Sequence, residues 1–102
     1  MTIQQLRYFL ALCQDLNYTR TAGRLYLSRQ ALRLSIAALE NELCGPLFVS
    51  AHHKLSLTER GLSLQRHAAP VVEQFQQMQA ALHAEIQSAQ PVRIGISVSL
   101  VP

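Results

Sequence analysis

Apolar residues recur at helical spacing over residues 2–16, at the start of the chain. The spacing is the i, i+3, i+4 pattern of a helix with one buried face. The apolar positions on this face are Leu6, Phe9, Leu10, Cys13 and Leu16. Thr2, followed three residues later by Gln5, fits a capping box that satisfies the first backbone N–H groups of a helix. The pattern therefore predicts an amphipathic helix over residues 2–16.

Two further helices are predicted before residue 45. A short helix over residues 19–25 has Thr19 as its cap, and its small residues Ala22 and Gly23 would let another helix cross close to it. Ser28 is a favourable N-cap and begins a third helix that runs to about residue 43. The predicted core face of the third helix consists of Leu32, Ile36, Leu39 and Leu43.

The next segment is short and partly alternating. Gly45, followed by Pro46, predicts a glycine C-cap at the end of the third helix. Phe48-Val49 and residues 54–57 indicate two small strands, with a turn over residues 50–53 between them. The turn has neither the Asn-Gly nor the Asp-Gly pair of a tight hairpin. The segment is nevertheless of the size of the β-ribbon called a wing.

A long helix is predicted from Thr58, its cap, to about Ser88, with Glu59 in the first turn where the helix dipole favours an acid. Its apolar residues repeat at steps of three and four, which is the narrow seam of a coiled coil. The seam consists of Leu64, Ala68, Val71, Phe75, Met78, Leu82 and Ile86. At about 1.5 Å per residue the helix would be about 45 Å long, too long to fold back on so small a domain. The seam is therefore expected to pair with a second helix.

Charge divides the chain into a basic and a neutral part. Residues 1–61 hold seven Lys or Arg against four acidic residues, whereas residues 62–102 hold two of each. This asymmetry suits a head that binds a polyanion. Cys13 and Cys44 are too few for a disulfide framework, and their apolar surroundings predict buried, reduced thiols in a cytoplasmic protein. No apolar stretch has membrane-spanning length.

The start of the third helix carries the chemistry of DNA recognition. Arg29 and Arg33 lie four residues apart and share a helix face, with Gln30 beside them. A helix fits the major groove, where arginine pairs with guanine and glutamine with adenine.

The sequence gives little support for an enzyme, because the chain has a single Asp, no glycine-rich phosphate loop and no arranged nucleophile and base. The fold class predicted is mainly α, a winged helix-turn-helix followed by a long dimerisation helix.

The amino-acid sequences of several segments, in this order along the chain, closely resemble those of LysR-type bacterial transcriptional regulators. The segments are Gln5-Leu6-Arg7-Tyr8-Phe9, Tyr18-Thr19-Arg20-Thr21-Ala22, Leu25-Tyr26-Leu27-Ser28, Ala31-Leu32, Leu39-Glu40-Asn41-Glu42-Leu43, Leu47-Phe48 and Leu57-Thr58-Glu59-Arg60-Gly61. The resemblance covers about residues 1–90 as a DNA-binding domain with its linker helix. The tail with Arg93-Ile94-Gly95 is similar to the first strand of the family's effector-binding domain.

The resemblance implies a homodimer through the linker helices and a recognition helix in the major groove. The family's base-reading positions fall on Arg29, Gln30, Arg33 and Leu34. This chain departs from the family where Arg33-Leu34 replaces Ser-Arg, where Ser50 replaces a basic residue, and where the wing carries His52 and His53. A complete regulator of this family would act in the cytoplasm, respond to a small-molecule effector and form dimers or higher oligomers.

These observations define three regions. Residues 1–61 are predicted as the DNA-binding domain, 58–89 as the dimerisation helix and 90–102 as the start of an effector-binding domain. No cofactor and no metal site are expected. The predicted contacts to double-stranded DNA are Thr19, Arg20, Ser28, Arg29, Gln30, Arg33, Leu34, His53 and Lys54. The predicted dimerisation residues are Leu64, Val71, Phe75, Met78, Leu82 and Ile86.

Two other interpretations remain open from the sequence. The chain could be a helical interaction module whose DNA-binding head is degenerate, an interpretation that Leu34, Ser50 and His53 favour. It could also be a short repressor that pairs with full-length copies and inactivates them.

Overall fold

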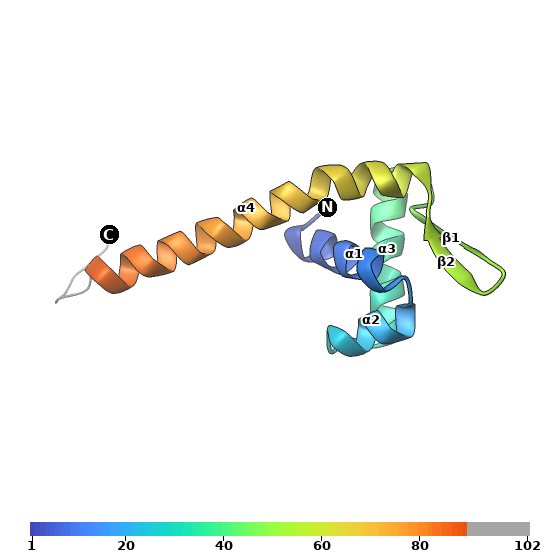
Figure 1. The fold of residues 1–102 in the computed structure, drawn as a ribbon, viewed down its shortest axis with the longest axis horizontal. Helices are drawn as coiled ribbons and strands as arrows, with labels where there is room; N and C mark the ends of the chain where they lie inside the picture. The colour runs from blue at the N-terminus through green and yellow to red at the C-terminus, as the bar shows by residue number, and fades with distance from the viewer. Residues whose placement is uncertain (90–102) are drawn as a thin grey trace. The chain divides into compact units, whose positions relative to one another are not determined.

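The computed structural model describes residues 1–89, which form four helices and one two-stranded antiparallel ribbon (Figure 1). The elements are α1 (Ile3–Asp15), α2 (Tyr18–Arg24), α3 (Arg29–Glu42), β1 (Phe48–Ala51), β2 (Lys54–Leu57) and α4 (Glu59–Ala89). The predicted mainly α fold with a small wing is confirmed. The chain divides after Val72 into two compact units, and α4 contributes residues to both.

Helix α1 begins and ends with identifiable caps. The predicted capping box is present, with the Thr2 hydroxyl accepting from the Gln5 backbone and the Gln5 side chain accepting from the Thr2 backbone. The helix ends at Leu16, whose φ of 50° is left-handed. The prediction that Leu16 shares the buried face of the helix is wrong, because this C-cap conformation directs it to the exposed surface.

Helix α2 begins one residue earlier than predicted. Its N-cap is Asn17, whose side-chain oxygen accepts from the Arg20 backbone N–H at 2.9 Å, so the prediction of Thr19 as the cap is wrong. Ala22 is buried in the core, as a small residue at a helix crossing should be. Gly23 faces open space, because no neighbouring atom lies within 4 Å of the position that a Cβ would take, so it makes no close helix contact.

Helix α3 starts and ends close to the predicted residues, but the glycine C-cap predicted at Gly45 is wrong. The Ser28 hydroxyl accepts from the Ala31 backbone N–H at 3.0 Å. Of the predicted core face, Leu32, Ile36 and Leu39 are buried, whereas Leu43 is the half-buried C-cap. The left-handed residue after the helix is Cys44, with φ 61°, and not Gly45. The Gly45 N–H then bonds back to the Glu40 carbonyl at 3.0 Å, the pattern of a Schellman motif.

The two cysteines lie in different environments. Cys13 is buried, and burial raises the pKa of its thiol to about 12. Cys44 is exposed, so the prediction that both thiols are buried is wrong for this one. Its place just beyond the end of α3 explains the difference, because that turn lies at the surface.

The core of the first unit lies among α1, α2 and α3 and extends to the start of the ribbon. Its buried members come from all three helices and from the residues at the start of the ribbon. They are Phe9, Leu12, Leu32, Ile36, Leu39 and Leu47, joined by Cys13, Ala22 and Phe48. The rings of Phe9 and Phe48 meet at 5.5 Å between centroids, in a tilted pair that ties α1 to the base of the ribbon.

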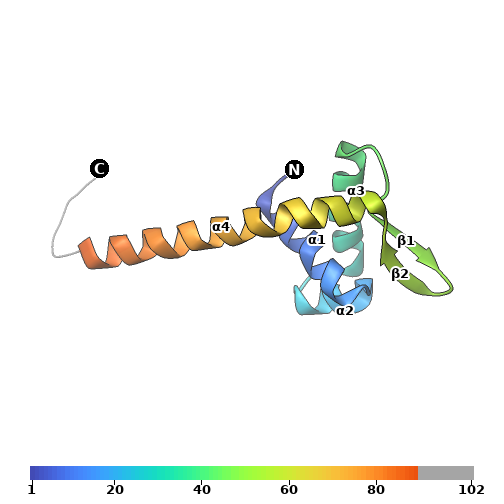
Figure 2. The same ribbon diagram turned by 45° about the horizontal axis from the view of Figure 1, so that its top comes forward.

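The ribbon is a tight hairpin. Strands β1 and β2 pair in register from Phe48 opposite Leu57 to Ala51 opposite Lys54, which leaves only His52 and His53 in the turn. Both histidines have positive φ, 53° and 62°, as a type I′ turn requires. The ribbon stands out from the three packed helices of this unit in both views (Figures 1 and 2).

Three hydrogen bonds fix the junction between the ribbon and the start of α4. The Thr58 hydroxyl accepts from the Gly61 N–H at 3.0 Å and donates to the Pro46 carbonyl at 2.7 Å. Arg60 donates to the Leu43 carbonyl at 2.7 Å, at the end of α3. A Cβ on Gly61 would lie 2.2 Å from the Leu47 carbonyl oxygen, so only glycine fits there.

The first part of α4 packs inside the first unit. Ala68 and Val72 are buried with Leu6 of α1, and Leu64 and Leu10 pack against them. The expectation that the whole of this helix is too long to fold back on the domain is therefore wrong for its first part. Leu64 belongs to this internal cluster. None of the helices within residues 1–89 combines the length and apolar character that crossing a membrane requires.

Candidate nucleic-acid interface

The N-terminal end of α3 presents a row of exposed side chains above a capped first turn. Arg29, Gln30, Arg33 and Leu34 are all exposed, while Leu32 between them is fully buried and anchors the helix to the core. Ser28, predicted to face DNA, is exposed and uses its hydroxyl as the N-cap. The helix is therefore held from its inner side and offers long polar side chains on its outer side.

The exposed residues of α3 form two neighbouring stripes. Residues four apart on a helix lie on the same face, so Arg29 and Arg33 make one stripe and Gln30 and Leu34 the next. The first stripe lines an open groove of about 420 Å³ and the second does not. Leu34 is 61% exposed, a large apolar side chain left in water.

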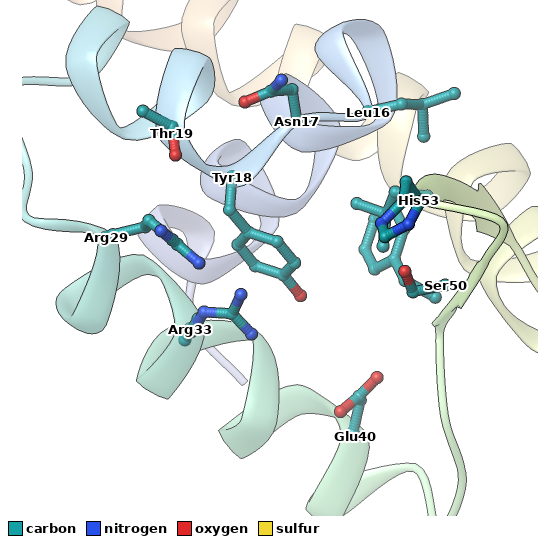
Figure 3. A pocket seen from close by; sticks show the side chains of 11 residues that line it. Leu16, Asn17, Tyr18, Thr19, Arg29, Arg33, Glu40, Ser50 and His53 are labelled. Atoms are coloured by element: carbon teal, nitrogen blue, oxygen red, sulfur yellow. The ribbon is translucent and has the colours of Figure 1, made fainter.

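The groove is bounded by the end of α1, the start of α2, α3 and the ribbon (Figure 3). Its wall is mostly polar and carries two guanidinium groups. The lining residues are Leu16, Asn17, Tyr18, Thr19, Arg29, Arg33, Glu40, Phe48, Ser50, His53 and Leu55. Thr19 and His53, both predicted from the sequence as DNA contacts, are thus brought together with the arginine stripe.

Arg33 lies over the ring of Tyr18, with its Cζ atom 4.4 Å from the ring centroid. Tyr18 is half-buried at the first position of α2, and Figure 3 shows its ring between the two helices. Burial raises the pKa of the Tyr18 hydroxyl, the negative charge of Glu40 raises it further, and Arg33 lowers it. A guanidinium on an aromatic face is held by a cation–π attraction.

Glu40 places one negative charge at the other end of the groove. Its Oε2 atom accepts from the Leu47 backbone N–H at 2.8 Å, so the carboxylate is engaged at the entry to the ribbon. Positive charge is thus concentrated at the N-terminal end of α3 and negative charge near its C-terminal end. The charge lining the groove therefore changes from positive to negative from the N-terminal to the C-terminal end of α3.

The two arginines of α2 differ in their availability. Arg20 is exposed and remains a predicted DNA contact. Arg24 bonds to the Asp15 carboxylate through Nε at 3.0 Å and Nη2 at 2.8 Å, and to the Ala11 carbonyl at 3.2 Å. Arg24 therefore ties α2 to α1.

The wing supplies the remaining predicted contacts. His53 lines the groove from the hairpin turn, with Ser50 on β1 also facing it. Lys54 is exposed beside the turn, opposite Ala51. Sequence reasoning missed Tyr18 and Asn17, because no local pattern links the start of α2 to a residue fifteen positions further along the chain.

The predicted dimerisation residues fall into two groups. Leu64 packs internally, as described above, and Phe75 is half-buried. Val71, Met78, Leu82 and Ile86 are exposed, with exposed fractions of 50%, 48%, 47% and 65%. Val72, not Val71, is the residue buried against α1.

No three His, Cys, Asp or Glu side chains gather into a metal-binding group within residues 1–89. The predicted start of a further domain at residues 90–102 lies outside the described residues.

The family model described as a bacterial regulatory helix-turn-helix protein of the lysR family matches residues 3–62. The chain belongs to the LysR family. The matched residues contain α1, α2, α3, the wing and the first residues of α4, and they form a LysR-type helix-turn-helix DNA-binding domain.

Relatives and solved structures of this family agree with the fold. The Hca operon transcriptional activator HcaR of Escherichia coli (strain K12) is 33% identical over 106 residues, which cover 100% of this chain and 36% of HcaR. A full-length OxyR from Pseudomonas aeruginosa matches with a TM-score of 0.77 at 31% identity, over 82% of this chain and 28% of OxyR. The CbnR DNA-binding domain, solved with DNA, matches with a TM-score of 0.76 at 27% identity, over 84% of this chain and 99% of that domain. This LysR-family chain thus spans little more than a third of the length of HcaR.

Proposed function

We propose that this LysR-family chain binds specific sequences of double-stranded DNA as a homodimer and is the DNA-binding part of a transcriptional regulator. The observation that carries the proposal is the exposed, capped start of α3 beside a groove with two arginines. Helix-turn-helix proteins insert such a helix into the major groove, where its first turns reach the base edges.

The outer stripe of α3 is suited to reading bases. Gln30 has the donor and acceptor that pair with the adenine edge, and the apolar Leu34 matches the methyl group of thymine. Both side chains are exposed and lie outside the groove. Arg29, at the first helical position, reaches either a guanine or a nearby phosphate.

The wing and α2 are suited to the DNA backbone. Lys54 and Arg20 are exposed cations, and Thr19 and His53 are exposed polar residues that line the groove. Such side chains contact phosphates and set the position of the protein on the duplex. The free energy from these contacts depends on salt, because each neutralised phosphate releases counterions.

We propose that α4 pairs two copies through residues 58–89. Support comes from Val71, Met78, Leu82 and Ile86, large apolar side chains that are about half exposed at coiled-coil spacing. A second α4 would cover them. A two-fold dimer presents two recognition helices, and its preferred DNA is then two-fold symmetric.

The wider role is inferred from the relatives. HcaR is named as an operon transcriptional activator, and the CbnR DNA-binding domain was solved with DNA. By analogy, we place this chain in the bacterial cytoplasm, where the chromosome lies, as part of a regulator without enzymatic activity. A small-molecule effector, and any oligomer larger than the dimer, would be features of a complete regulator of this family.

Selection of duplexes from a random library by the purified chain, at two salt concentrations, tests the proposal. We expect enrichment of a two-fold symmetric motif that persists at the higher salt. Recovery of unspecific duplexes only, whose binding is lost as salt rises, would instead favour an interaction module with a degenerate DNA-binding head. The exposed Leu34 would then be a sign of that degeneracy. Mixing the chain with a full-length family member and measuring its DNA binding tests the inactivating-repressor alternative.

A further inference from the structure

Arg33 is the one arginine of α3 that the structure holds against an aromatic ring, at 4.4 Å from the centroid of Tyr18. The two residues come from different helices, since Tyr18 begins α2 and Arg33 lies in the second turn of α3. Arg33 and Arg24 differ in their ionic partners. Arg24 is engaged by the Asp15 carboxylate, whereas Arg33 forms no ion pair within residues 1–89. Its N–H donors therefore remain available to a ligand.

The surroundings of this guanidinium match a sugar-phosphate strand better than a base edge. Arg33 lines the groove with Arg29, Thr19, Ser50 and His53, which are cationic or hydrogen-bonding side chains (Figure 3). The groove lies between α3 and the wing. A DNA strand that separates the major groove, filled by α3, from the groove reached by the wing would run there. Glu40 lies towards the C-terminal end of α3, so the positive end of the groove is the one with Arg29 and Arg33.

We propose that Tyr18 is a positioning residue that holds the Arg33 guanidinium in this groove, where it binds a DNA backbone phosphate, and that base reading falls to the neighbouring Gln30 and Leu34 stripe. The inference rests on the proposed DNA binding. It replaces the expectation, drawn from the spacing of the arginines and from the resemblance, that Arg33 reads a base.

The physical reason is preorganisation. A free arginine side chain has many rotamers, and ordering them on binding weakens the contact. A ring that attracts the cation restricts those rotamers before DNA arrives, and the half-buried Tyr18 is itself fixed by the packing of α2 on α3. Removing the ring therefore weakens the phosphate contact without removing the charge.

The test measures affinity of the purified chain for its selected duplex and for a random duplex across a salt series. Arg33→Ala is expected to weaken binding to both duplexes by a similar factor, roughly 5- to 10-fold near 0.1 M salt, and to reduce the slope of log affinity against log salt by about 0.9. Arg33→Lys, which keeps the charge, is expected to retain the slope. Arg66→Ala on α4 removes one exposed positive charge away from the groove, and it is the control for net charge.

Tyr18 is tested with two replacements. Tyr18→Phe keeps the ring and is expected to bind within about twofold of the native chain, whereas Tyr18→Leu is expected to lose about 2- to 5-fold on both duplexes. The double variant Tyr18→Leu with Arg33→Ala is expected to bind like Arg33→Ala alone. Melting temperatures of all variants separate a loss of binding from a loss of fold, because a merely structural role of Tyr18 would lower affinity equally with or without Arg33.

Three results would overturn the inference. A changed base preference in Arg33→Ala with an unchanged salt slope would make Arg33 a base reader. Additive losses in the double variant would remove Tyr18 as its positioning residue. Absence of all DNA binding would overturn both this inference and the proposed function. A selection that yields no motif, with the salt effects intact, would overturn sequence-specific recognition and with it the base-reading role of Gln30 and Leu34, and would leave the phosphate contact of Arg33 supported.

Discussion

Gly61 shows how closely one residue is specified by its neighbours. A Cβ at this position would lie 2.2 Å from the Leu47 carbonyl oxygen and 2.8 Å from Leu57 Cδ2. The carbonyl is backbone and cannot move without shifting the ribbon. The Leu-Thr-Glu-Arg-Gly segment carries part of the family resemblance, and each of its contacts has a physical reason. Thr58 caps α4, Arg60 caps the end of α3, and Gly61 allows the start of α4 to pack closely against Leu47.

We expect Gly61→Ala to destabilise the domain by about 1–3 kcal/mol, because overpacking against backbone exceeds the gain in helix propensity. Gly23→Ala is the matched control. Gly23 also lies in a helix, and nothing lies within 4 Å of an added Cβ, so this change should stabilise by about 0.5–1 kcal/mol. Urea denaturation of the native chain and the two variants checks whether the free energy of unfolding falls in Gly61→Ala and rises in Gly23→Ala. Equal effects of the two substitutions would contradict the steric argument.

A second residue-scale prediction concerns Asp15. Hydrogen bonds from Arg24 and Thr21 hold the pKa of the Asp15 carboxyl below its ordinary value. A lowered folded-state pKa contributes stability that is present above the unfolded pKa of about 3.9 and is lost as the pH falls through the folded value. Asp15→Asn should therefore make the acid loss of stability between about pH 5 and 2 shallower. Urea midpoints at several pH values check this, and superimposable curves for the two chains would contradict it.

At the scale of elements, the wing is the part whose local sequence conflicts most with its conformation. His52 and His53 both occupy the left-handed region, which costs non-glycine residues roughly 1–2 kcal/mol each. No asparagine or glycine relieves this, and the hairpin forms because its strands are tied to the core through Phe48 and to α4 through Leu57 and Thr58. The tertiary structure, not the turn sequence, selects the two-residue turn.

Replacing the turn by the pair His52→Asn and His53→Gly is expected to stabilise the domain by about 1 kcal/mol, since these residues adopt positive φ at little cost. His53→Val, a β-branched residue at the same position, should destabilise it. Thermal unfolding of the three proteins measures the order of stability. If His53→Val were as stable as the native chain, the turn would have to differ from the one described.

At the scale of the whole molecule, α4 serves two different purposes along its length. Up to Val72 it completes the core of the first unit, against Leu6 and Leu10 of α1. Beyond that point its apolar residues, including Met78, Leu82 and Ile86, are exposed in the single chain. Exposed apolar residues at coiled-coil spacing are typical of a surface that another helix covers.

We expect Phe75→Asp to weaken dimerisation by roughly two orders of magnitude or more, because each dimer would bury two unpaired carboxylates in an apolar seam. Gln77→Asp introduces the same charge nearly opposite the seam and serves as the control. Sedimentation equilibrium measures the dimer constant of each chain. A Phe75→Asp chain that remains as dimeric as the control would show that the interface lies elsewhere.

Much of the local structure follows from the sequence, because caps and periodic apolar residues act over only a few positions. The capping box at Thr2, the N-cap at Ser28 and the cap at Thr58 were all predictable, as were most of the buried residues of α3. On α1 the apolar spacing predicted Leu6, Phe9 and Cys13 but missed the fully buried Leu12. The exposed polar residues at the start of α3 follow for the same reason. A helix start with Arg29, Gln30 and Arg33 is visible without knowledge of the fold.

The remaining features depend on contacts between distant segments, which no local pattern encodes. Packing on α1 buries Val72 and leaves Val71 exposed, although both fit an apolar repeat. Strand pairing forces His52 and His53 into a tight turn. The packing of α2 against α3 brings Tyr18 to Arg33 and puts that arginine, but not Gln30, in the groove. The sequence by itself determined the helices and their capped starts, because those depend on neighbours in the chain; the tertiary structure decided which exposed side chains share a groove, because that depends on how the helices pack.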